Sequence, residues 1–373
     1  MKPLDVVCHE GMEALPASYR PLFEAAGSRN IFVSESWFAN FERTVLKAPD
    51  NARVYGVESA GSPTAALVMR LARPGEGFWA PVRLEALGNY YTSLYGIVAA
   101  GASHDSESIE ALAAALGSGR QPWDVLDLQP LDEQGSLYRE LPGLLRRRGL
   151  LVQTYFCFGN WYLEVGGRRY AEFFAERSSS LRKNIPYYTR KLERSPRSRV
   201  EIITGGEQLE RVLQDYENVY NSSWKTPEPF PEFIPGLVRT AARNGWLRFG
   251  IVYVEDEAAA AQIWIVHAGT ASIYKVAYDA RFAKLSVGTI LTAKMMEHVI
   301  DVDRVEVVDY LTGDDDYKKE WMSHRRERWG IVAFNPRRLR GALQAIRNIG
   351  GRALKDALKR RRAGAAPATA DKA

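Results

Sequence analysis

The chain has 373 residues, of which 46% are hydrophobic and 25% are charged. This composition is typical of a globular protein, and the length exceeds one typical core of about 150 residues, so we expect two domains. The two cysteines, Cys8 and Cys157, lie far apart, and the five histidines form no metal-ligand spacing with them or with each other. We therefore expect neither a disulfide scaffold nor a zinc finger nor any other metal site.

The net charge of +5 is concentrated at one end of the chain. Residues 337–362 contain ten Lys or Arg and one acid, which gives +9 locally and leaves −4 on the remainder. The first sixteen residues are interrupted by charged side chains, and the longest uncharged stretches carry glycines, tyrosines and amides. We expect no secretory signal, no bilayer span and a cytoplasmic location.

Hydrophobic periodicity predicts alternating helices and strands in the first half. Trp37, Phe38 and Phe41 lie on one side of a helical pattern that follows Ser34 and Ser36, which are candidate capping residues. The predicted elements are a helix at 19–47, strands at 53–58, 64–71, 84–87 and 94–99, a helix at 106–116, a strand at 124–128, a helix at 136–148 and a strand at 150–158.

The second half repeats this order of elements. Residues 124–128, followed by a helix and the Gly149 turn, parallel residues 305–310, followed by a helix and Gly330, which favours a diverged duplication. The predicted elements are strands at 161–165 and 199–203, helices at 170–194 (broken near Pro186), 206–220 and 231–244, three antiparallel strands at 247–255, 258–266 and 271–279, a helix at 287–300, a strand at 304–310, a helix at 317–324 and a strand at 330–334.

The turn at residues 280–289 opens a predicted helix and can bind an anion. A helix start presents free backbone N–H groups and a positive end of the helix dipole. Gly288 permits close approach of a ligand, Ser286 and Thr289 add hydroxyl donors, and Arg281 and Lys284 add positive charge. The alternative interpretation is an ordinary capped helix start.

Acidic residues and a tyrosine follow the strand at 304–310. A carboxylate such as Asp309, Asp279 or Asp314 can take a proton from an attacking amine, and the phenol of Tyr317 can return one to a leaving thiolate. This pairing suits acyl transfer. The alternative is that residues 314–316 cap a helix and that Tyr317 packs against its neighbours.

In this order, the elements resemble the GNAT superfamily of acyl-CoA-dependent N-acyltransferases, most of all the branch of CelD-like acetyltransferases associated with cellulose and exopolysaccharide, which is similar to the Fem peptidyltransferases. The resemblance covers about residues 161–334. It is carried by Leu181–Ile185 with Arg190–Leu192, Trp224, Ala260–Trp264, Tyr274–Lys275, Ala277–Asp279, Ser286–Thr289 and Gly313–Asp314 with Tyr317–Trp321.

The resemblance implies a tandem GNAT-like α/β fold of mixed, mostly antiparallel sheets flanked by helices. It implies a degenerate domain at 1–158 and an acyltransferase domain at 159–336. The charge and apolar spacing of residues 337–373 predict a basic amphipathic helix followed by a disordered tail. The family's Gln/Arg-x-x-Gly-x-Gly/Ala loop stands here as Ala283-Lys284-Leu285-Ser286-Val287-Gly288.

The resemblance also implies a set of site residues. Acetyl-CoA or another acyl-CoA is the expected co-substrate, with no metal, and an amine on a small molecule or saccharide is the expected acceptor. Tyr317, Asp309 and Asp279 are the catalytic candidates; Tyr274, Val276, Arg281, Lys284, Ser286, Val287, Gly288 and Thr289 the candidates for binding coenzyme A; and Arg182, Trp224, Asp314 and Lys318 the candidates for binding substrate.

The sequence is also compatible with two other functions. The first keeps the fold and takes aminoacyl-tRNA as the donor, as in the Fem relatives. The second is a non-catalytic accessory protein of exopolysaccharide assembly. Residues 337–362 place leucines and isoleucines near one helical face and can lie on an anionic membrane surface or bind an acidic partner. DNA is not an expected partner.

Overall fold

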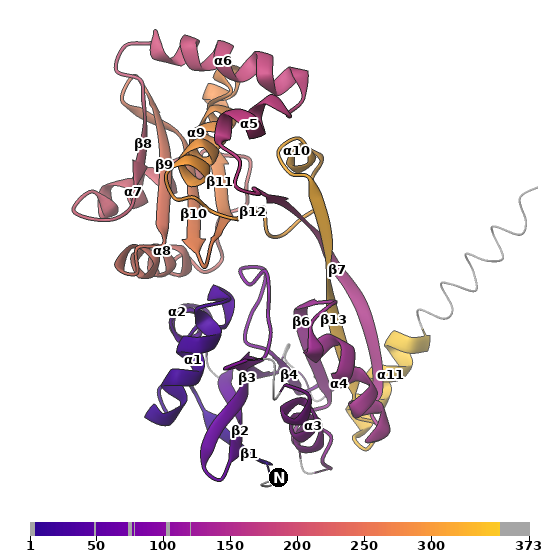
Figure 1. The fold of residues 1–373 in the computed structure, drawn as a ribbon. Coiled ribbons are helices and arrows are strands. Elements are labelled where there is room, and N and C mark those ends of the chain that lie inside the picture. The colour runs from indigo at the N-terminus through magenta and orange to yellow at the C-terminus, as the bar shows by residue number, and fades with distance from the viewer. Residues whose placement is uncertain are drawn as a thin grey trace, which may run out of the picture.

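The computed structural model describes residues 4–47, 50–73, 77, 79–101, 105–119 and 121–350. Two α/β halves lie one above the other in Figure 1, and two long strands run between them. The α/β class with tandem halves is therefore confirmed.

The first half consists of strands at the N-terminus and helices that cover them. Its elements are β1 (Leu4–Glu10), α1 (Arg20–Gly27), α2 (Glu35–Val45), β2 (Asn51–Ser59), β3 (Ser62–Ala72), β4 (Arg83–Ala86), β5 (Val98–Ala99), α3 (Asp105–Leu116), β6 (Val125–Asp132), α4 (Ser136–Arg147) and β7 (Leu151–Glu164).

The second half follows without a break and begins with two additional helices. Its elements are α5 (Tyr170–Ala175), α6 (Ser179–Glu193), β8 (Arg199–Ile203), α7 (Leu209–Asn221), α8 (Phe233–Arg243), β9 (Leu247–Val254), β10 (Glu257–His267), β11 (Thr270–Tyr278), α9 (Val287–Asp301), β12 (Val307–Asp309), α10 (Asp316–Lys319), β13 (His324–Phe334) and α11 (Leu339–Ala345). From β8 to β13 it repeats the order of β1 to β7 without a counterpart of β5.

Among the described residues the strands form one continuous sheet rather than two. Their order is β1-β2-β3-β4-β6-β13-β7-β12-β11-β10-β9-β8, with β5 paired to β3. Each half begins with four antiparallel strands and then adds a parallel one, β6 beside β4 and β12 beside β11. On its other side, β6 pairs with β13 from the second half, and β12 pairs with β7 from the first half. The two halves thus exchange their last strands.

Several predicted bounds in the first half differ from the structure. The helix expected at 19–47 is divided into α1, a 3-10 turn at Ile31–Val33 and α2, because Asn30 and Ser34 each cap a new helical segment with a side-chain oxygen. The strand β1 was not predicted. The strands expected at 150–158 and 161–165 are one strand, β7, so the expected domain boundary at 158/159 lies inside it.

Two helices in the second half also differ from their predictions. The expected break near Pro186 lies instead between α5 and α6, where Ser178 accepts a hydrogen bond from the Leu181 N–H and starts a new helix. The helix expected at 317–324 ends at Lys319, and β13 begins at His324 rather than at residue 330.

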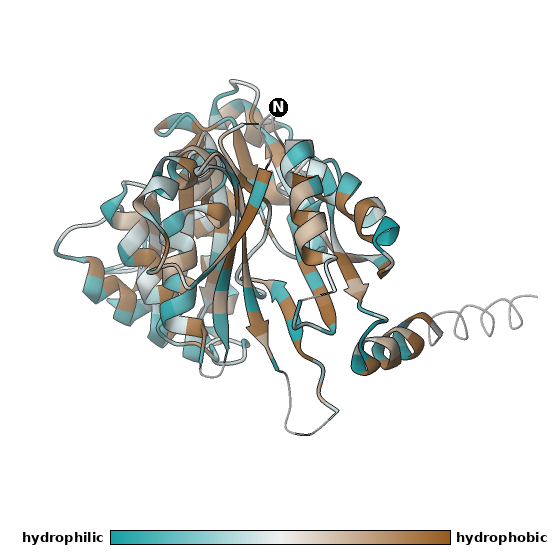
Figure 2. Ribbon diagram, turned by 90° about the horizontal axis from the view of Figure 1, so that it is seen from below, coloured by the Kyte–Doolittle hydropathy of each residue, from teal (hydrophilic) through white to brown (hydrophobic). Residues whose placement is uncertain are grey.

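The core is continuous across the junction of the halves. Trp37 on α2 contacts Phe233 on α8 edge to face, with ring centroids 5.4 Å apart. Tyr91, from the loop after β4, stacks on the same Phe233 ring at 4.0 Å. Figure 2 shows the corresponding pattern, with brown apolar segments on the central strands and teal polar segments on the flanking helices.

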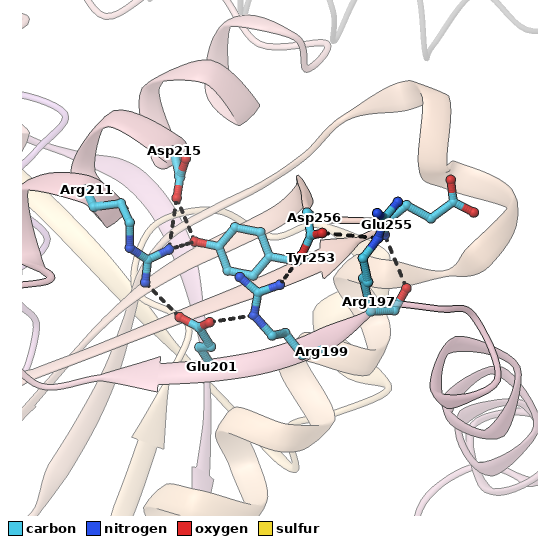
Figure 3. A network of polar contacts seen from close by, with 9 residues as sticks. Arg197, Arg199, Glu201, Arg211, Asp215, Tyr253, Glu255 and Asp256 are labelled. Atoms are coloured by element: carbon cyan, nitrogen blue, oxygen red, sulfur yellow. Dashed lines mark hydrogen bonds and ion pairs between the residues drawn. The ribbon is translucent and has the colours of Figure 1, made fainter.

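The edge strand β8 is held by a polar network (Figure 3). Arg199 Nε and Arg211 Nη2 both donate to Glu201, at 2.7 and 2.9 Å, and the Tyr253 hydroxyl donates to Asp215 at 2.6 Å. These contacts join β8 to α7 and β9. Charged side chains on an edge strand also oppose pairing with other chains.

The basic C-terminal region is described only as far as residue 350. Within it, α11 packs through Gly341, where a Cβ atom would lie 2.2 Å from the Asn335 carbonyl oxygen, and a short π-helical turn follows at Ile346–Gly350. The rest of the predicted helix at 337–362 and the tail at 363–373 lie outside the described residues. No helix in the described part of the chain is long and apolar enough to cross a bilayer.

Candidate functional site

The site begins where the parallel strands β11 and β12 separate. They pair over only three positions, and the last pair is Ser272 with Asp309. Beyond this pair, β11 continues to Tyr278. The segment that follows β12 turns away from it through Leu311 and Gly313, which both have positive φ. The strands therefore diverge and leave one edge of β11 open.

Two hollows lie at this opening. The first, of about 310 Å³, is bounded by β11, the start of α9 and α10, and we call it the donor-side hollow. The second, of about 190 Å³, lies toward the first half and includes Tyr90 and Tyr91, and we call it the acceptor-side hollow. Val276, Tyr310 and Tyr317 line both. A group held by these three residues can be reached from either side.

The first turn of α9 forms one wall of the donor-side hollow. Gln262 Nε2 donates to the Gly288 carbonyl at 3.1 Å and to Thr292 Oγ1 at 2.8 Å, and Trp264 Nε1 holds Gln262 Oε1 at 2.8 Å. Ser286 makes no side-chain cap to this helix. The turn is therefore fixed to β10, while its N–H groups are left without a cap from Ser286.

Ser286 has a glycine-like backbone. It stands at the first glycine position of the resembling loop and adopts φ 53° and ψ 34°, the left-handed conformation. At the second position, a Cβ on Gly288 would lie 3.3 Å from Tyr278 Cδ1. Ser286 thus adopts a backbone conformation that glycine takes more easily than serine.

Of the other residues predicted to bind coenzyme A, some line the hollows and others lie outside them. Val287 begins α9 with its side chain buried, Thr289 lines the donor-side hollow, and Lys284 is exposed on the preceding 3-10 helix. Tyr274 is oriented toward the first half, where its hydroxyl donates to the Tyr91 carbonyl at 3.0 Å. Arg281 pairs with Asp279 and Glu257 outside the hollow.

Tyr317, which the sequence analysis proposes as the proton donor, lines both hollows. Its ring meets Tyr310 edge to face at 5.7 Å. Tyr317 is 48% exposed, and the partial desolvation of its hydroxyl raises the pKa of that group to about 12. The phenol is therefore protonated at neutral pH. Lys318, the next residue, is buried and donates to the Thr312 carbonyl at 2.6 Å and the Gly313 carbonyl at 3.2 Å. Lys318 thus fixes the turn that places Tyr317.

The two other catalytic candidates are occupied by structural contacts. Asp309 is buried, accepts hydrogen bonds from Asn160 Nδ2 and the Leu311 N–H, both at 2.6 Å, and pairs with Arg326. Asp279 caps the 3-10 helix through the Arg281 N–H at 2.8 Å. Neither lines the donor-side or the acceptor-side hollow. Both carboxylates hold backbone segments in place.

Among the predicted substrate-binding residues, the structure brings only Trp224 and Lys318 to the two hollows. Trp224 is 61% exposed, tilts over the Tyr278 ring at 4.6 Å and lines the donor-side hollow. Arg182 is exposed on α6 and donates to the Arg177 carbonyl. Asp314 accepts from Trp161 Nε1 at 2.6 Å and pairs with Arg325, which joins the α10 turn to β7 and β13.

Lys225 is the main residue that the sequence analysis missed. Its Nζ lies in the acceptor-side hollow and donates to the Val276 carbonyl at 2.5 Å. Burial, together with repulsion from Lys275, lowers the pKa of Lys225 to about 8. A substantial fraction of this amine is therefore neutral near pH 8. Its only signal in the sequence was its position next to Trp224.

Glu228 completes the wall beside Lys225. Its carboxylate accepts from Lys275 Nζ and from the Tyr91 hydroxyl, both at 2.5 Å. Although burial opposes it, the hydrogen bond from Lys275 helps hold the pKa of Glu228 below its ordinary value. Glu228 thus links the segment after α7, β11 and the first half. Among the described residues, no group of three or more His, Cys, Asp or Glu side chains is placed to hold a metal ion.

Comparisons with known proteins give one family match and several solved structures of similar fold. Residues 179–319 match the family model of the acetyltransferase (GNAT) domain. No curated protein matches the chain in sequence. The fold is similar to that of FemX, with 10% identity and a TM-score of 0.58 over 86% of this chain and 96% of that one.

Two further solved structures share the fold. A tandem GNAT protein from the clavulanic acid biosynthesis pathway has 10% identity and a TM-score of 0.51, covering 90% of this chain and 99% of that one. L-PGS from Bacillus licheniformis has 13% identity and a TM-score of 0.51, covering 92% and 98%. At these identities the likeness extends to the fold alone.

Proposed function

We propose that the protein is an N-acyltransferase that moves an acyl group, acetyl in the first instance, from coenzyme A to an amine, because residues 179–319 match the family model of the acetyltransferase (GNAT) domain. The observation that carries the proposal is the opening between β11 and β12, where Tyr317 and Val276 line two hollows on opposite sides. A donor and an acceptor can each enter from their own side.

The donor-side hollow fits an acyl-CoA. The first turn of α9 offers N–H groups to a pyrophosphate, and Gly288 leaves room for close approach. The open edge of β11 offers backbone groups to the pantetheine amides on either side of the Val276 carbonyl, which itself accepts from Lys225 Nζ. Bound there, an acyl-CoA would supply a thioester, whose carbonyl carbon is the centre that the amine attacks.

Lys225 and Tyr317 divide the proton transfers. The neutral Lys225 amine takes a proton from the acceptor's ammonium group, which frees the lone pair for attack on the thioester carbonyl. Lys225 passes this first proton to solvent and is neutral again. As the new C–N bond forms and the C–S bond breaks, Lys225 takes the second proton that the nitrogen loses, and Tyr317 donates its hydroxyl proton to the leaving thiolate. The proton on Lys225 then returns to the tyrosinate, so that each turnover releases one proton to solvent.

Donor binding is the first step to test. Calorimetric titration of the full chain with acetyl-CoA and desulfo-CoA should give micromolar dissociation constants, and Gly288→Trp should abolish binding because an indole would fill the donor-side hollow. Gly101→Trp is the matched control, since Gly101 is exposed and a Cβ there has no neighbour within 4 Å. Failure of the wild-type chain to bind either ligand would refute the proposal.

An amino sugar or polysaccharide precursor is the acceptor we propose, in keeping with the CelD-like resemblance and a role in exopolysaccharide biosynthesis. Aminoacyl-tRNA remains the alternative donor, because α6 exposes Arg182, Lys183, Arg190 and Lys191. Salt-dependent binding of charged tRNA without acetyl-CoA binding would favour that alternative. The glycine-like backbone of Ser286 argues against a purely accessory role.

We also propose that the C-terminal region contacts an anionic membrane surface at the cytoplasmic face. Leu339, Leu343 and Ile346 are spaced one helical turn apart and are 66%, 45% and 70% exposed. Flotation with phosphatidylglycerol vesicles tests this: the wild-type chain should float, and a triple serine variant at these positions should float less. Equal flotation would exclude this surface as the contact.

A further inference from the structure

A third hollow, of about 450 Å³, lies in the first half, and the proposed chemistry does not use it. It opens where the parallel strands β4 and β6 part after their last pair, Glu85 with Asp127. The divergence of β11 and β12 after Ser272 and Asp309 is its counterpart in the second half. We call it the first-half hollow. Its volume lies in the range of small-molecule sites.

The charges around the first-half hollow cancel. Arg70 Nη2 pairs with Glu85 at 2.7 Å, Arg83 pairs with both Glu85 and Asp127 (2.9 Å to the latter), and the Tyr155 hydroxyl donates to Asp127 at 2.5 Å. Two guanidinium groups thus face two carboxylates, all mostly buried. A phosphate or carboxylate would find no surplus positive charge, so the network favours an uncharged polar ligand.

One buried hydroxyl in this hollow lacks a partner. Thr92 is 1% exposed and lines the hollow, and its Oγ1 makes no hydrogen bond to any described residue. The Thr92 Oγ1 atom is closed to solvent in the free protein, so a ligand hydroxyl pairs with it only when the Thr92 side chain turns toward the hollow. That pairing would recover the free energy that an unpaired buried hydroxyl costs. The amides of Asn89 and Gln129 lie on the same wall and offer further donors and acceptors.

An exposed aromatic ring joins this hollow to the acceptor-side hollow. Tyr90 is 52% exposed, rests against the Tyr91 ring at 4.4 Å, and lines both hollows together with Thr312. Aromatic faces bind the apolar face of a flat amphipathic ligand, and surrounding polar groups bind its hydroxyls. A ligand in the first-half hollow can therefore extend past Tyr90 toward Lys225.

We propose that the first-half hollow binds an uncharged saccharide ring, the non-reacting part of an amino-sugar acceptor whose amine lies beside Lys225. The inference rests on the proposed function for the identity of the reacting end, while saccharide binding itself does not require a donor. The ring would rest on Tyr90, with one hydroxyl on Thr92 and others on Asn89, Gln129 and the charge-paired network.

The test measures saccharide binding by the full chain in the absence of coenzyme A. The probe is the β-1,4-linked disaccharide of glucosamine and glucose, whose glucose ring is uncharged, titrated by calorimetry and by saturation-transfer NMR. The wild-type chain should bind it saturably. Thr92→Val should weaken binding about tenfold while leaving the melting temperature unchanged or higher, because the lost hydroxyl has no partner in the free protein. Tyr90→Ala should weaken binding as well.

Ser108→Ala is the matched control. Ser108 is also a buried hydroxyl without a partner among the described residues, but it lies on α3 and does not line the hollow. Saccharide binding by Ser108→Ala should equal that of the wild type. Equal binding by Thr92→Val would overturn the inference, and so would binding of glucosamine 6-phosphate but not of the disaccharide.

The same samples separate this inference from the proposed function. If the disaccharide binds and acetyl-CoA does not, the acyl-CoA proposal fails and the saccharide site remains supported. If acetyl-CoA binds and no saccharide does, the saccharide site is wrong and the acyltransferase proposal remains.

Discussion

The Nζ atom of Lys225 lies 2.5 Å from the carbonyl oxygen of Val276, on the one edge of β11 that β12 leaves open. This contact places a partly buried amine at the boundary of the donor-side and acceptor-side hollows. A neutral lysine can donate one N–H to this carbonyl and still accept a proton from a substrate. We therefore propose that the proton acceptor of the site comes from the segment after α7 rather than from a strand-end carboxylate.

Lys225→Met should remove the pH dependence that this amine imposes. Because its pKa is lowered to about 8, Lys225 is protonated below that pH and neutral above it, so the acetylation rate should rise as the pH increases through about 8. The variant should lose this rise and about two to three orders of magnitude in kcat. The measurement is a pH–rate profile with acetyl-CoA and glucosamine.

Lys284→Met is the matched control for that profile. Lys284 is exposed on the 3-10 helix before α9 and does not line either hollow. Its variant should keep the wild-type rise with pH. A wild-type profile in Lys225→Met would show that another group accepts the proton.

Tyr317→Phe should slow the chemical step without weakening donor binding. The Tyr317 hydroxyl, with its pKa raised to about 12 by partial desolvation, is protonated and can supply a proton to the thiolate. Removing it should lower kcat about 100-fold and leave the KM for acetyl-CoA within a factor of three. Tyr187→Phe, at an exposed tyrosine of α6, should be neutral in the same assay. An unchanged kcat for Tyr317→Phe would assign the tyrosine to packing.

Much of the second half could be predicted from its sequence because its signals are local. The apolar runs of β9 and β10, the apolar and polar residues of β11 and the short turns between them indicate three hairpin-connected strands. The motif around Tyr317 also predicted correctly that this residue follows the strand β12 on a short helix. These features depend on near neighbours in the chain.

The exchange of strands could not be predicted in this way. The strand period fixes which side chains share a face, but it does not say which other strand will pair. β13 lies between β6 and β7 because of contacts such as Trp329 with Phe156, at 5.9 Å, and Arg328 with Asp132, which join residues far apart in sequence. Lys225 escaped prediction for the same reason, since its role arises from Val276 fifty-one residues away.

Ser286→Gly should stabilise the protein. A residue other than glycine with φ 53° costs about 1 kcal/mol, and Ser286 makes no cap that would offset this cost. We expect the melting temperature to rise by about 1–2 °C and acetyl-CoA binding to be kept. Ser178→Gly is the contrasting variant, because Ser178 caps α6 at normal φ, and its melting temperature should fall. A lower melting temperature for Ser286→Gly would mean that its hydroxyl has a stabilising contact.

The exchanged strands make the second half dependent on the first. A fragment of residues 159–336 lacks β6 and the first eight residues of β7, so Trp329–Phe334 of β13 would lose a partner on both sides. Those unpaired edges expose Ile331 and Phe334, which are buried in the intact chain. We expect this fragment to aggregate, whereas residues 121–336, which retain β6 and all of β7, should be more soluble. Both lack α2, the partner of α8, so the comparison isolates the strand pairing. Size-exclusion chromatography and circular dichroism measure the difference, and a monomeric 159–336 fragment with a cooperative melting transition would show that the second half folds without these strands.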